Sequence, residues 1–140
     1  MRRIALAIAL LLAAAVPSLA VSPVPGTPLA ASSGNVANAT ATATLPAAAN
    51  QVTYISGFEV TGSGTTAGAV FTCTVTGIVG GTLSYTYAAA VGAVVANTPL
   101  IVEYPIPIPA SGPGVAIVVS CPALGATSTN NTVDAHGFQL

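Results

Sequence analysis

The chain has 140 residues, of which 53% are hydrophobic and only 4% are charged. This apolar content suffices for the core of one ordinary domain and argues against a disordered chain. Arg2 and Arg3 are its only Lys or Arg residues. Their scarcity argues against nucleic-acid binding, and against anionic lipid surfaces and nucleotide phosphates as partners, because these ligands are held mostly by Lys and Arg.

Residues 1–20 have the parts of a secretory signal peptide. Arg2 and Arg3 precede an uninterrupted apolar run over residues 4–16, and Ser18 and Ala20 supply the small residues of a cleavage site. We expect cleavage after Ala20 and an exported protein that is secreted, periplasmic or held at the cell surface. The main alternative is an uncleaved leader that serves as a membrane anchor.

Residues 21–34 form the second predicted region, a flexible arm. Pro23, Pro25 and Pro28 interrupt this stretch, which shows no steady hydrophobic period. The folded domain is then expected to cover residues 35–140.

The first two strands of that domain are predicted from alternating side chains. Alanines and Leu45 alternate with Asn and Thr over residues 36–45, and these small side chains suit an edge strand or a close contact between sheets. Over residues 51–61, strict alternation places Tyr54 and Phe58 on one face and Ile55 on the other. Gly57 marks a bulge or a close backbone approach within this strand.

Both cysteines fall on apolar rows of predicted strands. Cys73 shares one face of the strand 69–77 with Phe71, and Cys121 ends an alternating run over residues 115–121. The pattern suggests two core strands that face each other. A Cys73–Cys121 disulfide would close a loop of about 50 residues and stabilise the fold by about 4 kcal/mol; the alternative is two buried free thiols.

The remaining predicted strands complete an all-β domain. Residues 82–87 place Leu83, Tyr85 and Tyr87 on one face of a hairpin strand, whereas residues 88–96 are open between strand, loop and helical turn. Further strands are expected at 98–104, 115–121 and 132–140. Prolines at every second position from 105 to 109 predict an extended segment along an edge or across the top of the sandwich.

About seven to eight short antiparallel strands without an amphipathic helix predict a single β-sandwich, with a jelly-roll or an immunoglobulin-like layout. The order of the strands is not readable from the sequence. Few charges and many threonines on the outward faces predict that this surface is covered by self-association into an oligomer or a larger assembly.

No residue pattern predicts an enzyme. Asp134 and His136 lie two apart on one strand, so their side chains point outward in parallel and do not make the end-on contact of a catalytic pair. Glu59 and Glu103 are the only glutamates, and both are expected to be solvated on outward faces rather than paired across a glycosidase cleft. No metal site or cofactor is predicted, because the ligand residues show no known spacing.

The carboxyl-terminal two thirds contain several distinctive segments, which are residues 54–62, 74–77 with 80–83, 98–105, 109–111, 116–120 and 135–139. Together these segments resemble a group of small uncharacterised proteins that tailed-phage and prophage genomes encode. The resemblance covers residues 45–140. Its most specific part is residues 125–130 with 135–138. It implies a single β-sandwich domain associated with a virion and without catalytic residues.

The function predicted from the sequence is therefore a non-enzymatic structural or interaction protein, a phage or prophage decoration-type or surface-exposed assembly domain. Its partners would be other copies of the chain and a capsid or cell-surface protein. The leader and the two cysteines are not features of the phage group, so a prophage-derived or host surface protein stands beside the virion location. An exported carbohydrate-binding module is the alternative function, because exposed tyrosines such as Tyr54, Tyr85 and Tyr87 can stack on sugars.

Overall fold

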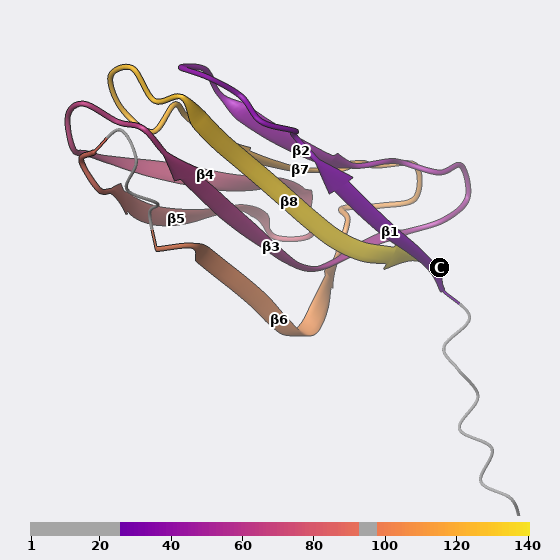
Figure 1. The fold of residues 1–140 in the computed structure, drawn as a ribbon. Coiled ribbons are helices and arrows are strands. Elements are labelled where there is room, and N and C mark those ends of the chain that lie inside the picture. The colour runs from indigo at the N-terminus through magenta and orange to yellow at the C-terminus, as the bar shows by residue number, and fades with distance from the viewer. Residues whose placement is uncertain (1–25, 93–97) are drawn as a thin grey trace, which may run out of the picture.

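The computed structural model describes residues 26–92 and 98–140 of the chain. Within these residues the fold is all-β, with eight antiparallel strands in two packed four-stranded sheets (Figure 1). The leader predicted at residues 1–20 lies outside the described residues. The strands are β1 (Thr27–Ser32), β2 (Ala41–Leu45), β3 (Thr53–Ser63), β4 (Ala69–Ile78), β5 (Gly81–Ala89), β6 (Leu100–Pro109), β7 (Ile117–Cys121) and β8 (Asn130–Gln139).

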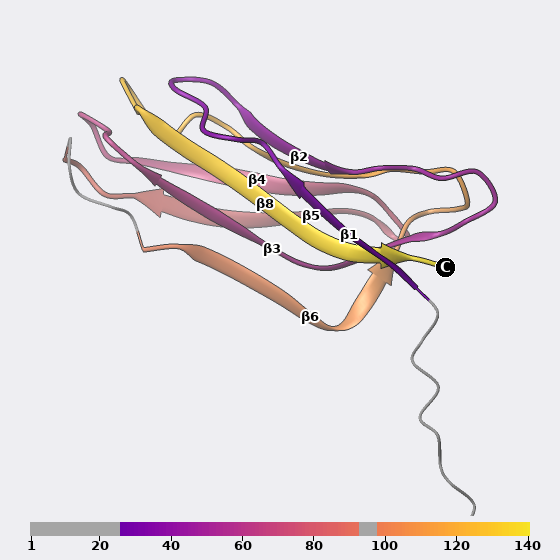
Figure 2. The same cartoon turned by 45° about the vertical axis from the view of Figure 1, so that its right-hand side comes forward.

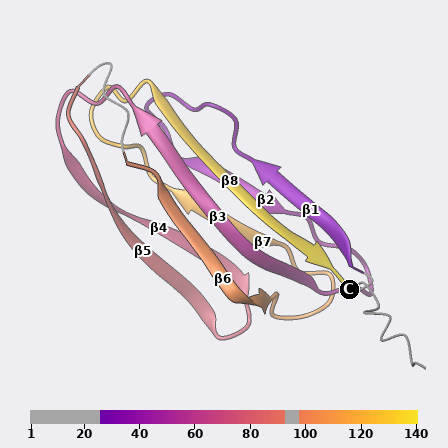
Figure 3. The same cartoon turned by 60° about the horizontal axis from the view of Figure 1, so that its bottom comes forward.

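The strand order identifies the sandwich as a jelly roll. One sheet has the order β1-β8-β3-β6 and the other β2-β7-β4-β5 (Figures 1 and 3). The first strand pairs with the eighth, the second with the seventh, the third with the sixth and the fourth with the fifth. The chain is therefore one long antiparallel hairpin that is rolled into two sheets, which is the jelly-roll arrangement. Of the two layouts that the sequence left open, this excludes the immunoglobulin-like one.

Strand alternation builds the core between the two sheets. On β2 the small residues Ala41 and Ala43 and the larger Leu45 are fully buried, while the threonines between them are exposed. Phe58 of β3 meets the ring of Tyr85 edge-on across the core, with 5.2 Å between the ring centroids. β2 lies at an edge of its sheet, one of the two positions that its small side chains suit.

The predicted flexible arm is wrong for residues 27–32, which form strand β1. These residues pair antiparallel with β8, from Thr27 opposite Gln139 to Ser32 opposite Asp134. Their backbone amides and carbonyls gain partners from β8 although the sequence shows no hydrophobic period. Because of this pairing, the carboxyl terminus and the start of the described chain lie at the same end of the sandwich (Figure 2).

A bulge in β3 confirms one prediction and corrects another. The register with both neighbouring strands shifts between Ile55 and Gly57, where the sequence predicted an irregularity. The extra residue exchanges the two faces, so Ile55 is buried together with Phe58 while Tyr54 faces outward. The strict alternation that placed Tyr54 and Phe58 on one face was therefore wrong.

The disulfide between Cys73 and Cys121 is present, with the two Cα atoms 4.2 Å apart. Both residues are fully buried on the inner face of one sheet, on the adjacent strands β4 and β7. The prediction that these strands face each other across the core was wrong, because they are hydrogen-bonded neighbours. A disulfide of this kind indicates an oxidising, extracytoplasmic location.

The proline-rich segment forms the edge of its sheet, which is one of the two positions that the sequence left open. β6 pairs with β3 on one side only, and the pairing jumps from Glu103 to Ile108, so the chain between them leaves the ladder. Ile106 in this section is 85% exposed. Residues 26–92 and 98–140 contain no helix of the length and apolar character needed to cross a membrane.

Candidate functional site

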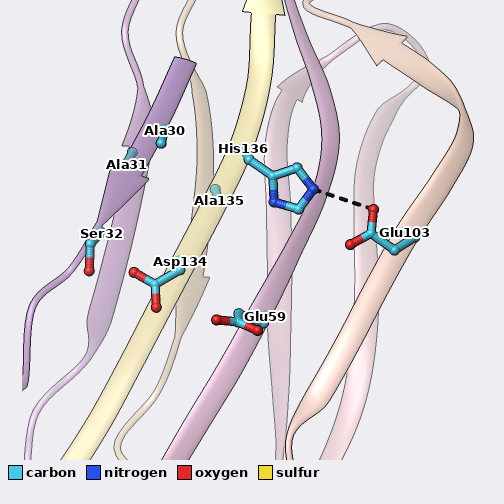
Figure 4. A pocket seen from close by; sticks show the side chains of 8 residues that line it. All are labelled: Ala30, Ala31, Ser32, Glu59, Glu103, Asp134, Ala135 and His136. Atoms are coloured by element: carbon cyan, nitrogen blue, oxygen red, sulfur yellow. Dashed lines mark hydrogen bonds and ion pairs between the residues drawn. The ribbon is translucent and has the colours of Figure 1, made fainter. Parts of the chain in front are cut away.

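The charged side chains of the described chain gather on one face of the molecule. Glu59 lies on β3, Glu103 on β6, and Asp134 and His136 on β8, which are three adjacent strands of one sheet. These are all the acidic residues and the only histidine of the sequence, whereas Arg2 and Arg3 precede the described residues. The four side chains line one hollow on the outer face of the sheet, beside Ala30 and Ser32 of β1 (Figure 4). We call this group the acidic patch.

The register of the sheet sets the neighbours within the acidic patch. Asp134 lies directly opposite Glu59, so two carboxylates are placed side by side on β8 and β3. One step along the sheet, Gly57 of β3 has His136 as its partner on β8 and Glu103 as its partner on β6. The strand between the histidine and the glutamate therefore presents a residue without a side chain at this point.

Gly57 is what allows His136 and Glu103 to meet across an intervening strand. The Nε2 atom of His136 lies 3.3 Å from Oε2 of Glu103, and Figure 4 shows both side chains reaching over β3. A Cβ atom at Gly57 would lie 2.7 Å from the same Oε2 and 2.6 Å from the carbonyl oxygen of Val102. The side chains of His136 and Glu103 are 47% and 62% exposed, so this is a solvated ion pair of small energetic value when the histidine is protonated.

The structure places the four polar candidates of the sequence as follows. Asp134 and His136 share the outer face of β8, as predicted, and the partner of His136 is Glu103 rather than Asp134. Glu59 and Glu103 both face outward, as predicted, and the fold brings them to one hollow. The outward positions were readable from alternation, but the convergence depends on strand order and register, for which the sequence carries no local signal.

An aromatic pair adjoins the acidic patch on the same face. Tyr54 of β3 stacks on Phe138 of β8, with 5.0 Å between ring centroids and 9° between ring planes. Phe138 also lines a second, apolar hollow with Pro28 of β1 and Pro107 of β6. The sequence did not single out Phe138, and its two-residue spacing from His136 on β8 was the signal that would have placed it on this face.

The opposite sheet presents an outer face of hydroxyl groups without a charged residue among the described strands. One row crosses all four strands from Thr42 through Ser120 and Thr74 to Ser84. The hydroxyls of Thr42 and Ser120 are 3.4 Å apart. Thr44, Thr72, Thr76 and Thr86 extend the array along the strands, and Val70 is 72% exposed beside it. We call this surface the hydroxyl face.

The other tyrosines point into the sandwich. Tyr87 is 8% exposed and its hydroxyl donates to the carbonyl of Thr98, and burial raises its pKa. The hydroxyls of Tyr85 and Tyr104 are 2.9 Å apart and join β5 to β6 between the two sheets. Burial first, and then the hydrogen bond with Tyr85, raises the pKa of Tyr104. Tyr54, Tyr85 and Tyr87 therefore do not form an exposed row.

The chemistry available to the acidic patch is that of solvated groups on an open sheet. The cysteines are bridged and buried, so neither is a nucleophile. In the part of the chain that the structure describes, no group of three or more His, Cys, Asp or Glu side chains is arranged to hold a metal ion. Comparison of the chain with protein-family models, curated proteins and solved structures found no match.

Proposed function

We propose that the chain is a non-enzymatic structural domain of an extracytoplasmic surface, and that it enters an assembly through the hydroxyl face. The observation that carries this proposal is the separation of charge between the two sheets. The acidic patch occupies the outer face of β1-β8-β3-β6, and among the described residues no charged side chain belongs to the strands β2-β7-β4-β5. Soluble domains ordinarily distribute charges over their whole surface, whereas surfaces that are buried in assemblies are depleted of them.

This separation gives the domain an orientation. The acidic patch keeps one sheet solvated, while Thr and Ser side chains can enter a contact at a lower desolvation cost than charged ones. Val70, which is 72% exposed on the hydroxyl face, would gain cover in such a contact. The hydroxyl face is therefore the side that is built into the assembly.

The disulfide and the predicted leader support an exported location, secreted, periplasmic or at the cell surface. The resemblance to phage-encoded sandwich domains supports the more specific role of a decoration-type protein on a virion or a prophage-derived surface. Jelly rolls occur in viral capsids and in lectins, so by analogy alone the fold agrees with a virion protein and with a sugar-binding protein.

The test compares two matched threonines on opposite faces. Thr74 and Thr132 are both partly exposed on central strands, Thr74 on the hydroxyl face and Thr132 on the opposite sheet. In sedimentation of the purified full chain over a range of concentrations, we expect Thr74→Lys to weaken assembly by at least about tenfold and Thr132→Lys to leave it unchanged. Equal effects of the two lysines, or none, would overturn the role of the hydroxyl face.

A carbohydrate-binding module remains the second candidate, and the Tyr54–Phe138 stack beside the acidic patch is the observation that favours it. An aromatic surface next to carboxylates is suited to stacking on a sugar and bonding its hydroxyls. Retention of the wild type on insoluble polysaccharides, lost in Phe138→Ala and kept in Thr74→Lys, would favour this function over assembly.

A further inference from the structure

We infer that two copies of the chain pair edge to edge through β5, so that the sheet β2-β7-β4-β5 continues across a twofold axis. This inference rests on the proposed assembly function and specifies one contact through which two copies of the chain associate. It comes from the four strand edges of the sandwich, which differ in how well they are protected against pairing.

Three of the four edges carry features that discourage an added strand. β6 has prolines at 105, 107 and 109 and leaves its ladder after Glu103. β1 contains Pro28, and β2 is only five residues long. Prolines, irregular pairing and short length are the means by which natural edge strands avoid pairing with other chains.

β5 has no proline and is not short, and its one irregularity is a register shift between Gly81 and Leu83, at its start. It lies at the edge of its sheet, beside β4 (Figure 3). It is nine residues long, contains neither proline nor charge, and pairs without a register shift from Leu83 to Ala89. A long, regular, uncharged edge is the kind of strand that accepts another strand. Because β5 has no charge, two antiparallel copies of it meet without repulsion between like charges.

The Cα separation at the disulfide indicates which backbone groups of β5 point outward. A Cα separation of 4.2 Å marks Cys73 and Cys121 as a pair without mutual backbone hydrogen bonds, so the backbone of Cys73 bonds on its other side, to Tyr85. By alternation, the amides and carbonyls of Thr82, Ser84 and Thr86 point away from β4. No hydrogen bond from elsewhere in residues 26–92 and 98–140 reaches these outward groups.

The inward side chains of β5 are also not fully buried. Leu83 lies opposite the fully buried Val75 and so faces the core, yet it is 36% exposed because β5 is the edge strand of the described sheet. A second β5 around a twofold axis perpendicular to the sheet would place the two inner rows on the same side. It would cover Leu83 and would also continue the hydroxyl face into the neighbouring copy.

Proline substitution tests this pairing with a control on the same sheet. Ser84→Pro removes an outward amide from β5 and leaves the ladder with β4 intact. By the same alternation the amide of Thr42 on β2 points outward, and Thr42 ends the row that begins at Ser84, so Thr42→Pro makes the equivalent change at the opposite edge. The measurement is the sedimentation of the full chain together with its near-ultraviolet circular dichroism.

We expect a wild-type dimer whose dissociation constant rises at least about tenfold in Ser84→Pro and stays unchanged in Thr42→Pro, with native dichroism in all three proteins. Amide exchange should also be at least about tenfold slower at Thr82 and Thr86 in the wild type than in Ser84→Pro. A monomeric wild type, or a dimer that both prolines weaken equally, overturns the pairing. If Ser84→Pro disrupts folding, unprotected Thr82 and Thr86 amides in the associated wild type overturn it independently.

The same sedimentation series separates the two proposals. Assembly that responds to Thr74→Lys but not to Ser84→Pro overturns the β5 pairing and supports the hydroxyl face. The reverse response overturns the hydroxyl face and supports the β5 pairing.

Discussion

His136 and Glu103 form an ion pair across a strand that separates them. His136 lies on β8 and Glu103 on β6, β3 runs between the two, and Nε2 and Oε2 are nevertheless only 3.3 Å apart. The contact exists because the residue of β3 between them is Gly57. The bulge that Gly57 closes also exchanges the faces of β3, so one glycine both shapes the acidic patch and fixes which residues of β3 are buried.

Gly57→Ala should therefore destabilise the fold by about 1–3 kcal/mol, as insertions into closely packed sites do. The added Cβ would lie 2.6 Å from the carbonyl oxygen of Val102, a backbone atom that cannot rotate away. Urea unfolding of the purified chain measures the change. Gly112→Ala is the control, because no atom lies within 4 Å of its added Cβ, and it should be neutral or slightly stabilising. An equal effect of both alanines would contradict the role of Gly57.

The ion pair itself should contribute little to stability. His136→Ala and Glu103→Gln are each expected to change the free energy of unfolding by less than about 1 kcal/mol, because both side chains are substantially exposed. Urea unfolding of the purified variants measures both changes. A loss as large as that expected for Gly57→Ala would show that the pair is structural, and would assign the effect of Gly57 to it.

The local features of the fold could be predicted from the sequence because they depend on neighbouring residues. Alternation placed Phe71, Cys73 and Val75 on the core row of β4, and the spacing of prolines located the β6 edge. β1 was missed because its residues Thr-Pro-Leu-Ala-Ala-Ser have no hydrophobic period and become a strand only through the ladder that β8 provides. The hydrogen bonds that make this segment a strand come from residues more than 100 positions away, as in the pair of Ser32 with Asp134.

The candidate site, in contrast, depends on how distant segments pair. Glu59, Glu103 and His136 could each be placed on an outward face, but their convergence requires that β3, β6 and β8 be neighbours. The bulge at Gly57 could be located from the sequence. Its effect on Tyr54 was missed, because the extra residue places Tyr54 and Phe58 on opposite faces of the sheet. Strand order and register are set by packing of the whole sandwich, so no single segment of sequence encodes them.

Removal of the disulfide should cost about 4 kcal/mol, because it frees a long loop in the unfolded chain. The bridge joins residues 48 apart in sequence, and both are fully buried. Comparison of urea midpoints for the wild type and the Cys73→Ala/Cys121→Ala variant measures the loss, and intact mass before and after alkylation verifies the bridge in the wild type. Free thiols in the purified wild type, or equal midpoints, would contradict this prediction.

Stability should fall at alkaline pH because of Tyr104. Burial and the hydrogen bond with Tyr85 raise the pKa of Tyr104 in the folded state above its ordinary value of 10.0. Above pH 10 the unfolded chain therefore loses the tyrosine proton while the folded chain retains it, and the free energy of unfolding decreases as pH rises. Urea unfolding at a series of pH values, with tyrosinate absorbance recorded in parallel, measures this decrease; it should be absent below the unfolded pKa.

Tyr85→Phe separates the two causes of that raised pKa. The variant should lose about 1 kcal/mol at neutral pH, because one hydrogen bond is removed. Its stability should then decrease less steeply above pH 10, because burial alone still raises the pKa of Tyr104. Tyr54→Phe is the control, since the Tyr54 hydroxyl makes no hydrogen bond within the described residues, and it should retain the wild-type slope. A Tyr85→Phe slope equal to that of the wild type would assign the whole shift to burial and would contradict a role for the Tyr85–Tyr104 bond.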